Sequence, residues 1–249
     1  MLDFIKVVIL GIVEGITEWL PVSSTGHLIL VGSVLKPGLS DAFMEMFDVV
    51  IQLGAIMAVV VLYFHKLNPF SPRKSERQKM LTWQMWIKVA IASVPAAIVG
   101  LLFNDYLDAI FYKPVPVAIM LIVYGVLFII IEDKHRGKQP KVTRISQLTL
   151  KMLLWIGVFQ MLALIPGTSR SGATIVGALI IGVSRETAAE FTFFLAIPAM
   201  FGASFLKLIK FGLNFTGMQV FLLFFVTVVS FAFSILAVKF FLLYIRHHY

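Results

Sequence analysis

The chain has 249 residues, of which 59% are hydrophobic and 14% are charged, and its mean hydropathy is +0.95. Soluble domains carry about 25% charged residues, so this composition predicts an integral membrane protein and excludes a separate soluble domain. The net charge of +8 does not indicate nucleic-acid binding, because the basic residues are not interleaved with aromatic ones. The absence of cysteine excludes disulfides, thiolate metal sites and cysteine nucleophiles.

The first predicted element is a helical hairpin over residues 4–35. Its helices, 4–20 and 24–35, are interrupted at Pro21, which lacks a backbone donor and pushes Leu20 out of the α region. The second helix is much shorter than the roughly 20 residues that a membrane span needs. A short helical pair with a polar turn predicts a re-entrant hairpin, whose turn must be surrounded by protein or by a wet cavity.

Five longer apolar segments and a second hairpin complete the chain. The second hairpin, residues 148–182, consists of predicted helices 148–165 and 172–182 and is interrupted at Pro166 in the same way. Each longer segment has about the 20 residues of a transmembrane helix; the segments are 42–64, 84–103, 114–132, 187–211 and 217–245. We therefore predict an all-α integral membrane protein with a single domain, residues 1–249, containing two re-entrant hairpins and five transmembrane helices.

Three blocks of sequence recur in order at a nearly constant spacing, which indicates an internal duplication. The matches are Gly11-Ile-Val-Glu14 with Gly157-Val-Phe-Gln160, Ser23-Ser-Thr-Gly26 with Ser169-Arg-Ser-Gly172, and Phe47–Ile56 with Phe191–Met200. Repeat one covers residues 1–132 and repeat two covers 147–249. The counterpart of segment 114–132 would fall beyond Tyr249, so we expect that the sequence stops before a sixth transmembrane helix or that the duplication lost it, and we favour the former.

The distribution of basic residues predicts the orientation. Lysines and arginines concentrate in residues 65–88 and 134–151, whereas residues 104–113 contain one lysine and two aspartates. The positive-inside rule makes both basic segments cytoplasmic and the middle one external. The first hairpin then enters from outside and the second from inside, so the repeats are inverted and their turns meet near the middle of the bilayer. Lys207 and Lys210 fall on the external side, against the rule.

The first turn carries an unusual set of polar residues for an apolar sequence. Glu14 and Glu18 share one helix face, with Cβ atoms roughly 5–6 Å apart. A carboxylate costs about 2.5 kcal/mol or more at the centre of a membrane helix, which favours a functional role. Two such carboxylates suit a divalent cation, Mg²⁺ or Ca²⁺, whose coordination is completed by water and a substrate phosphate.

Hydroxyls and a histidine follow these acids. Ser23, Ser24 and Thr25 lie where a helix begins, where free N–H groups can bind an anion, and one of the three is expected to be the N-cap. His27 is the only histidine inside an apolar segment. It is either a buried histidine with satisfied hydrogen bonds or, beside two acids and a serine, part of a catalytic site.

The second turn, Pro166–Thr174, contains Arg170, which needs an anionic partner in apolar surroundings. The alternative to a substrate is a structural ion pair with Glu14 or Glu18. Glycines in this turn would let backbone N–H groups approach a phosphate. Acids, hydroxyls, an imidazole and a guanidinium among apolar helices together indicate an integral-membrane enzyme that acts on a lipid phosphate.

The segments Glu14–His27 and Pro166–Thr174 closely resemble the two signature motifs of the undecaprenyl-diphosphatase, or bacitracin-resistance, family, and the likeness covers essentially the whole chain. The resemblance implies hydrolysis of undecaprenyl diphosphate to undecaprenyl phosphate and inorganic phosphate. This reaction recycles the lipid carrier of peptidoglycan synthesis in cell wall biogenesis and confers bacitracin resistance. The resemblance also implies a divalent cation, the bacterial inner membrane, and an active site that faces the external, periplasmic side.

Matching the family motifs by position assigns roles to individual residues. Glu14 and Glu18 would hold the cation, Ser24 would attack the phosphorus, and Arg170 would stabilise the phosphate oxygens. His27 would relay protons or would itself be the nucleophile, forming a phosphohistidine. The expected substrate-binding residues are Ser23, Thr25, Gly167, Ser169, Ser171, Gly172 and Thr174.

Two other classes of function stay open at this stage. A transporter or flippase of a polyprenyl phosphate lipid would use the same inverted repeats but would need no nucleophile. A purely structural membrane subunit would leave the polar residues unexplained. The oligomeric state, a homodimer included, and the preferred lipid chain length do not follow from the sequence.

Overall fold

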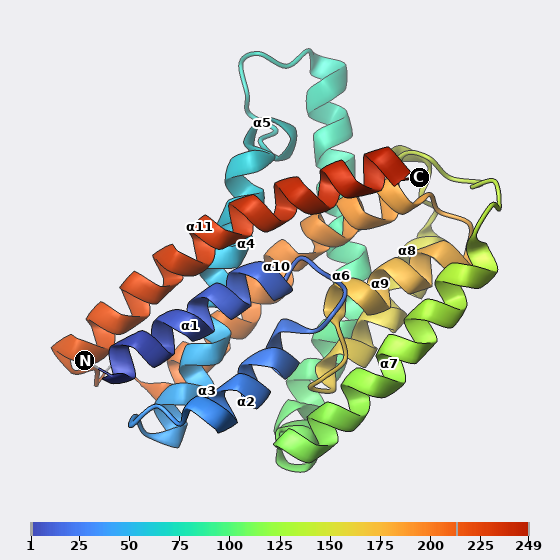
Figure 1. Cartoon of the computed structure of the whole chain (residues 1–249). Coiled ribbons are helices and arrows are strands. Elements are labelled where there is room, and N and C mark those ends of the chain that lie inside the picture. Colours follow the sequence, from blue (N-terminus) through green and yellow to red (C-terminus); the bar gives the residue numbers. More distant parts are fainter. Residues whose placement is uncertain (1, 213, 249) are drawn as a thin grey trace.

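The computed structural model describes residues 2–212 and 214–248, which form helices, turns and loops with one isolated β-bridge between Val142 and Val183 (Figure 1). In chain order the helices are α1 Leu2–Thr17, α2 Ser24–Leu35, α3 Asp41–Val50, α4 Gln52–Leu62, α5 Phe64–Leu67, α6 Glu76–Phe111, α7 Pro114–His135, η1 Ile145–Gln147, α8 Leu150–Met161, η2 Leu162–Leu164, α9 Arg170–Ile180, α10 Arg185–Phe211 and α11 Gly217–His248. The predicted all-α fold is confirmed.

Among the described residues, five stretches of helix are long and apolar enough to cross a membrane, as predicted: Asp41–Leu62, Glu76–Phe103, Pro114–His135, Arg185–Phe211 and Gly217–Ile245. The second of these begins at Glu76 instead of residue 84. Ser75 and Gln78 form a capping box there, and this polar first turn extends the helix beyond its apolar part. The first stretch consists of α3 and α4, which are separated at Ile51.

The two hairpins differ from the prediction at their turns. Helix α1 ends at Thr17, so residues 18–20, predicted to be helical, form a turn. The chain therefore leaves the helix before it reaches Pro21, at which no α-helical hydrogen bond could be donated. Helix α9 begins at Arg170 instead of residue 172, because the side chain of Ser169 caps it by accepting from the backbone N–H of Gly172.

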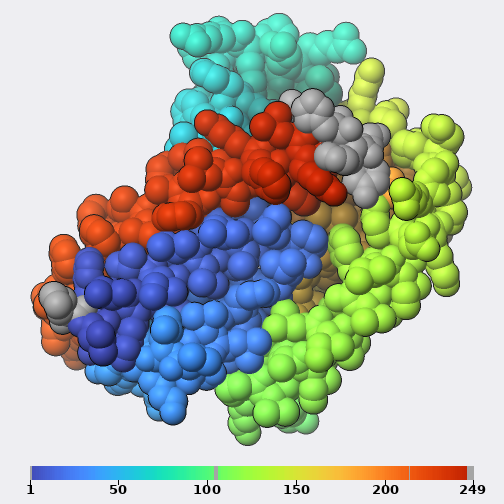
Figure 2. Space-filling view, in the orientation of Figure 1, coloured from blue at the N-terminus to red at the C-terminus, as the bar shows by residue number. Residues whose placement is uncertain are grey.

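Close helix contacts position both hairpins. Helix α1 packs along α11, and Figure 2 shows the two side by side at the surface. A Cβ added to Gly11 would lie 2.5 Å from the side chain of Val226, so only glycine permits this approach. In the second hairpin α8 packs along α6, where a Cβ added to Gly157 would lie 2.5 Å from the carbonyl oxygen of Ala92.

Candidate active site

The turns of the two hairpins are in contact, as the sequence predicts. Ser171 Oγ donates a hydrogen bond to the carbonyl oxygen of Leu20 at 3.2 Å. Beside this hydrogen bond the backbones of the two turns approach closely at Gly26 and Gly167. A Cβ added to Gly26 would lie 3.3 Å from the Cα of Gly167. The contact brings together polar groups that are far apart in the sequence. Glu18 and Arg170, for example, are 152 residues apart and share this site.

Glu18 is the centre of this site, and it is 7% exposed. Its Oε1 accepts a hydrogen bond from Arg170 Nη2 at 2.8 Å, and its Oε2 accepts a short hydrogen bond from Ser24 Oγ. Arg170 also donates from Nη1 to the carbonyl oxygen of Thr192 at 3.3 Å. The Arg170–Glu18 ion pair considered from sequence is therefore present, and the same carboxylate also binds the serine hydroxyl.

Glu14 is fully buried one helical turn before Glu18. Both of its carboxylate oxygens lack a hydrogen-bond partner within the described residues. Carboxylates from Glu18 and Asp48 lie within electrostatic range of it. An unpartnered buried carboxylate is costly, so this position needs a proton or a cation.

Asp48 was missed by the sequence reasoning. It is 7% exposed, on α3, and its Oδ2 accepts a hydrogen bond from the hydroxyl of Tyr112 at 3.3 Å. Burial and the neighbouring Asp48 raise the pKa of Tyr112 well above its ordinary value, so the phenol remains a donor. The sequence contained a signal for Asp48, because an acid inside the apolar segment 42–64 has the same energetic cost in a membrane as Glu14.

His27 lies on α2, half-buried, and its Nδ1 is 2.8 Å from the carbonyl oxygen of Ser23. Because a carbonyl only accepts, Nδ1 carries a hydrogen, and Nε2 has a free lone pair in the neutral form of the imidazole. Ser24 therefore bonds to Glu18, while the imidazole bonds to its own turn. Ser23 Oγ accepts from the N–H of Gly26 at 3.3 Å, so one of the three hydroxyls is the expected N-cap, and Thr25 beside it is half-buried.

The hydroxyls of the second turn make local hydrogen bonds. Ser169 Oγ accepts from the N–H of Gly172 at 3.0 Å and lies 3.1 Å from Ser171 Oγ. Thr174 Oγ1 donates to the carbonyl oxygen of Arg170 at 2.9 Å and lies 2.9 Å from Thr192 Oγ1. These contacts hold the turn in shape, and a role in substrate binding stays a prediction.

Gly167 has a φ of +95°, and a Cβ there would lie 2.7 Å from the carbonyl oxygen of Val117. Both the left-handed conformation and the close approach to α7 require glycine. The packing of the turn thus accounts for Gly167 without a ligand, and its predicted contact with phosphate stays a prediction.

Glu14 and Glu18 are the residues predicted to hold a divalent cation. Within the described residues there is no group of three or more His, Cys, Asp or Glu side chains arranged to hold a metal ion. The unpartnered oxygens of Glu14, with Glu18 one turn away, nevertheless match the hard oxygen ligands that Mg²⁺ and Ca²⁺ prefer. Both oxygens of Glu18 already have partners, so Glu14 is the freer ligand of the two.

Comparison with known proteins identifies the family. Residues 7–249 match the family described as Bacitracin resistance protein BacA. The chain belongs to this family. An undecaprenyl-diphosphatase of Enterococcus faecalis is 60% identical over 244 residues, which cover 97% of this chain and 88% of the relative. Proteins of the same name from Acetivibrio thermocellus and Desulfitobacterium hafniense are 58% and 56% identical, covering 100% and 99% of this chain and 91% and 89% of those relatives. The BacA match contains both turns, so the whole two-turn site lies within it.

Proposed function

We propose that this protein is a membrane-embedded hydrolase that converts undecaprenyl diphosphate to undecaprenyl phosphate and inorganic phosphate. This activity would recycle the lipid carrier of bacterial cell-wall synthesis and confer bacitracin resistance. Relatives with 56–60% identity carry the name undecaprenyl-diphosphatase. The observation that carries the proposal is the carboxylate of Glu18, which joins the hydroxyl of Ser24 to the guanidinium of Arg170. A nucleophile, a base and a cation for phosphate are thereby held together.

The geometry supports Ser24 as the nucleophile. Ser24 Oγ already donates its hydrogen to Glu18 Oε2, so Glu18 can accept that proton as Ser24 Oγ bonds to the terminal phosphorus. The bond from phosphorus to the bridging oxygen breaks, and undecaprenyl phosphate leaves with the proton from Glu18, which is again a carboxylate. Glu18 then takes a proton from the water that attacks the phosphoserine. The bond from phosphorus to Ser24 Oγ breaks, the serine regains its proton from Glu18, and inorganic phosphate is released. Arg170 would stabilise the equatorial oxygens with the N–H groups that Glu18 and Thr192 do not occupy.

His27 remains the alternative nucleophile. Its Nε2 keeps a lone pair because Nδ1 donates to Ser23. In that version the imidazole attacks and a phosphohistidine forms. The two versions differ chemically, since phosphoserine survives acid and phosphohistidine does not.

Glu14 and Glu18 would hold the divalent cation, Mg²⁺ or Ca²⁺. When bound, such an ion neutralises charge on the diphosphate and on the leaving group. Glu14 contributes the unpartnered oxygens. Glu18 can contribute only by sharing or releasing one of its present partners, Ser24 or Arg170, when substrate enters.

The membrane arrangement we propose is an inverted repeat with two re-entrant hairpins. Helix α8 has 12 residues and is about 18 Å long at 1.5 Å per residue, which is too short for a hydrocarbon core of about 30 Å. Each hairpin packs its first helix against a long helix of the other half, α1 on α11 and α8 on α6. This reciprocal packing is what a duplicated, interlocked pair of halves would produce.

The orientation and partners follow from charge and substrate chemistry. We place the protein in the bacterial inner membrane, with residues 65–88 and 134–151 in the cytoplasm and the site open to the periplasm. Lys207, which opposes this rule, forms ion pairs with Glu45 and Asp108, so its charge is neutralised locally. The expected partners are the lipid substrate and membrane lipids, without nucleic acid, and a homodimer is compatible with this arrangement.

The test is phosphate release from undecaprenyl diphosphate by the detergent-purified protein, with and without a chelator. We expect release that the chelator abolishes and that leaves an acid-stable phosphoenzyme when the reaction is quenched. An acid-labile phosphoenzyme would transfer the nucleophile role to His27. If the folded protein released no phosphate, the lipid transporter would be favoured, because a transporter does not hydrolyse its substrate.

A further inference from the structure

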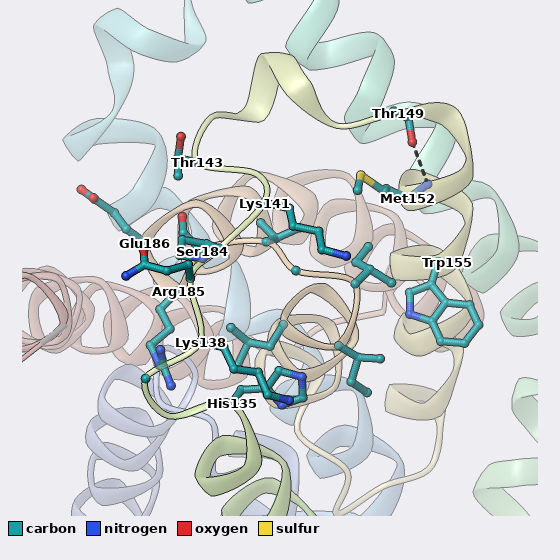
Figure 3. A pocket seen from close by; sticks show the side chains of 18 of the residues that line it. His135, Lys138, Lys141, Thr143, Thr149, Met152, Trp155, Ser184, Arg185 and Glu186 are labelled. Atoms are coloured by element: carbon teal, nitrogen blue, oxygen red, sulfur yellow. Dashed lines mark hydrogen bonds between the residues drawn. The ribbon is translucent and has the colours of Figure 1, made fainter.

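A cavity lies apart from the two turns and is lined in part by residues from the basic segment 134–151 (Figure 3). It has a volume of about 1220 Å³ and shares no lining residue with the site described above. Its walls come from the end of α7, the loop that follows, the start of α8 and the junction between α9 and α10. A cavity of this size can hold the polar part of a lipid, since ligand sites typically measure about 300–1,000 Å³.

The charges around the cavity are mostly positive. Four cations line it, Lys138, Lys141, Lys151 and Arg185, with one carboxylate, that of Glu186. Arg185 Nε is paired with Glu132 Oε1 at 2.5 Å. For the three lysines, the described part of the chain provides no carboxylate within ion-pair distance of their ammonium groups. The cavity thus presents an excess of positive charge that an anion would neutralise.

Two helices, α8 and α10, begin at the cavity. Thr149 caps α8 and Ser184 caps α10, and both capping residues line the cavity. The first turn of α8 has no acidic residue but contains Lys151, a cation where the helix dipole disfavours one. An anion bound beside α8 would be stabilised by this helix end and by Lys151, whereas the first turn of α10 already contains the carboxylate of Glu186.

One side of the cavity is apolar and open. Met152, Trp155 and Ile180 line it, and Trp155 and Ile180 are 41% and 39% exposed. Tryptophan is typical of the membrane–water interface. In Figure 3, Lys141 extends from the loop toward the side that carries Trp155, so charge and apolar surface lie next to each other. A soluble anion would use the lysines but would leave this apolar surface uncovered.

We propose that this cavity binds the phosphate group of an anionic phospholipid, with the acyl chains lying over Trp155 and Ile180. The phosphate would be bound by Lys138, Lys141 and Lys151 and by the N-terminus of α8. By the positive-inside rule this is the cytoplasmic face, where basic pockets between transmembrane helices recognise anionic head groups. The binding is independent of the hydrolytic reaction, so it can be present or absent whatever the two-turn site does.

The experiment measures the Kd of fluorescent phosphatidylglycerol for the detergent-purified full chain. The test variant is Lys138→Gln with Lys141→Gln, and the matched control is Arg73→Gln with Arg77→Gln. The control removes the same charge from two exposed arginines in the other basic segment. We expect the test variant to weaken binding on the order of tenfold to thirtyfold and the control to change it by less than about twofold. Arg170→Ala should leave the Kd unchanged, which separates this cavity from the two-turn site.

Competition identifies the source of the phosphate. Unlabelled phosphatidylglycerol should displace the probe, whereas inorganic phosphate and phosphatidylcholine should not at the same concentration. Equal weakening by the test and control variants would mean general attraction to a basic face and would overturn the proposal. Displacement by inorganic phosphate, or loss of binding in Arg170→Ala, would overturn it as well. Should the double variant fold poorly by circular dichroism, Lys151→Gln repeats the test with one exposed side chain.

Discussion

The two turns that form the site occupy equivalent positions in the matching sequence blocks, but their buried polar groups and backbone conformations differ. In the first, Glu14 is buried without a partner and Ser23 has a left-handed φ of +64°. In the second, Ser169, at the position equivalent to Ser23, caps its helix with an ordinary φ of −68°. The groups able to react are concentrated in the first turn, and the second turn contributes a guanidinium, that of Arg170, on a well-bonded frame.

The equivalent positions Glu14 and Gln160 show the same division. Both are buried, and both have side-chain oxygens without a hydrogen-bond partner in the described structure. Only one of them can carry a charge. A duplicated site therefore needs just one set of reacting groups, and strain and unpaired charge are retained where chemistry uses them. Five predictions follow from this difference, given from the largest effect to the smallest.

Replacing the hydroxyl of the first turn should have the largest effect. Ser24→Ala removes the proposed nucleophile, and we expect phosphate release to fall by about 10⁴-fold. The same type of change in the second turn, Ser169→Ala, removes a helix cap and should cost about 1 kcal/mol of stability with activity largely kept. Steady-state phosphate release and thermal unfolding in detergent measure the two effects. Near-normal activity in Ser24→Ala would refute the serine mechanism.

Replacing Arg170, the guanidinium of the second turn, should have the second-largest effect. Arg170→Ala removes the cation that faces the phosphate, and we expect kcat to fall by about 10³-fold. Arg170→Lys should recover only part of the loss, because an ammonium does not reproduce the two-pronged geometry of a guanidinium. A fall in substrate affinity alone, with kcat intact, would show that Arg170 binds the ground state only.

Glu14→Gln should alter the response to metal. We expect the Mg²⁺ concentration for half-maximal activity to rise about tenfold to a hundredfold, because an amide is a weaker ligand than a carboxylate. Activity should largely return at saturating Mg²⁺, and a chelator should abolish it in both proteins. An unchanged metal titration would remove Glu14 from the cation site.

The reciprocal change tests the second hairpin. Gln160→Glu places a carboxylate in a buried position whose side-chain oxygen has no hydrogen-bond partner among the described residues, and we expect a loss of about 2.5 kcal/mol of stability. Glu14→Gln should not destabilise the protein. Unfolding of both variants in detergent checks the contrast, which would fail if the two substitutions were equally tolerated.

The helix caps should give the smallest effect. Ser23→Gly relieves a strained φ worth about 1 kcal/mol and gives up a cap worth a few tenths, so stability should hold or rise. Ser169→Gly has no strain to relieve and should be less stable than the wild type. Apparent Tm values that fall equally in both would show that Ser23 is unstrained in solution.

Much of the fold could be predicted from the sequence, because the length of an apolar segment predicts a membrane span and a proline predicts where a helix is interrupted. The five spans and the breaks near Pro21 and Pro166 follow from these two signals. The start of α6 at Glu76 could not be placed this way, because a capping box of polar residues has no hydropathy signal. The separation of α3 from α4 at Ile51 has no proline or glycine at the break, so these signals do not predict it either.

The site was predicted as a set of residues more successfully than as a set of contacts. Sequence brought Glu18, Ser24 and Arg170 together through the repeat. It associated Ser24 with His27, whereas the structure gives Ser24 the carboxylate of Glu18, because the turn after Thr17 folds Glu18 back over the start of α2. Spacing along one helix predicts neighbours on that helix, but partners across a turn depend on backbone geometry that spacing does not encode.

The central claim is that Glu18 and Arg170, from different turns, act as one catalytic unit. The most direct test is a double-mutant cycle on phosphate release with Glu18→Gln, Arg170→Ala and the combined variant, all verified as folded. If the residues act together, the combined variant will be about as slow as the slower single variant. Losses that multiply would mean that the two residues act independently, and would contradict a single site built from both turns.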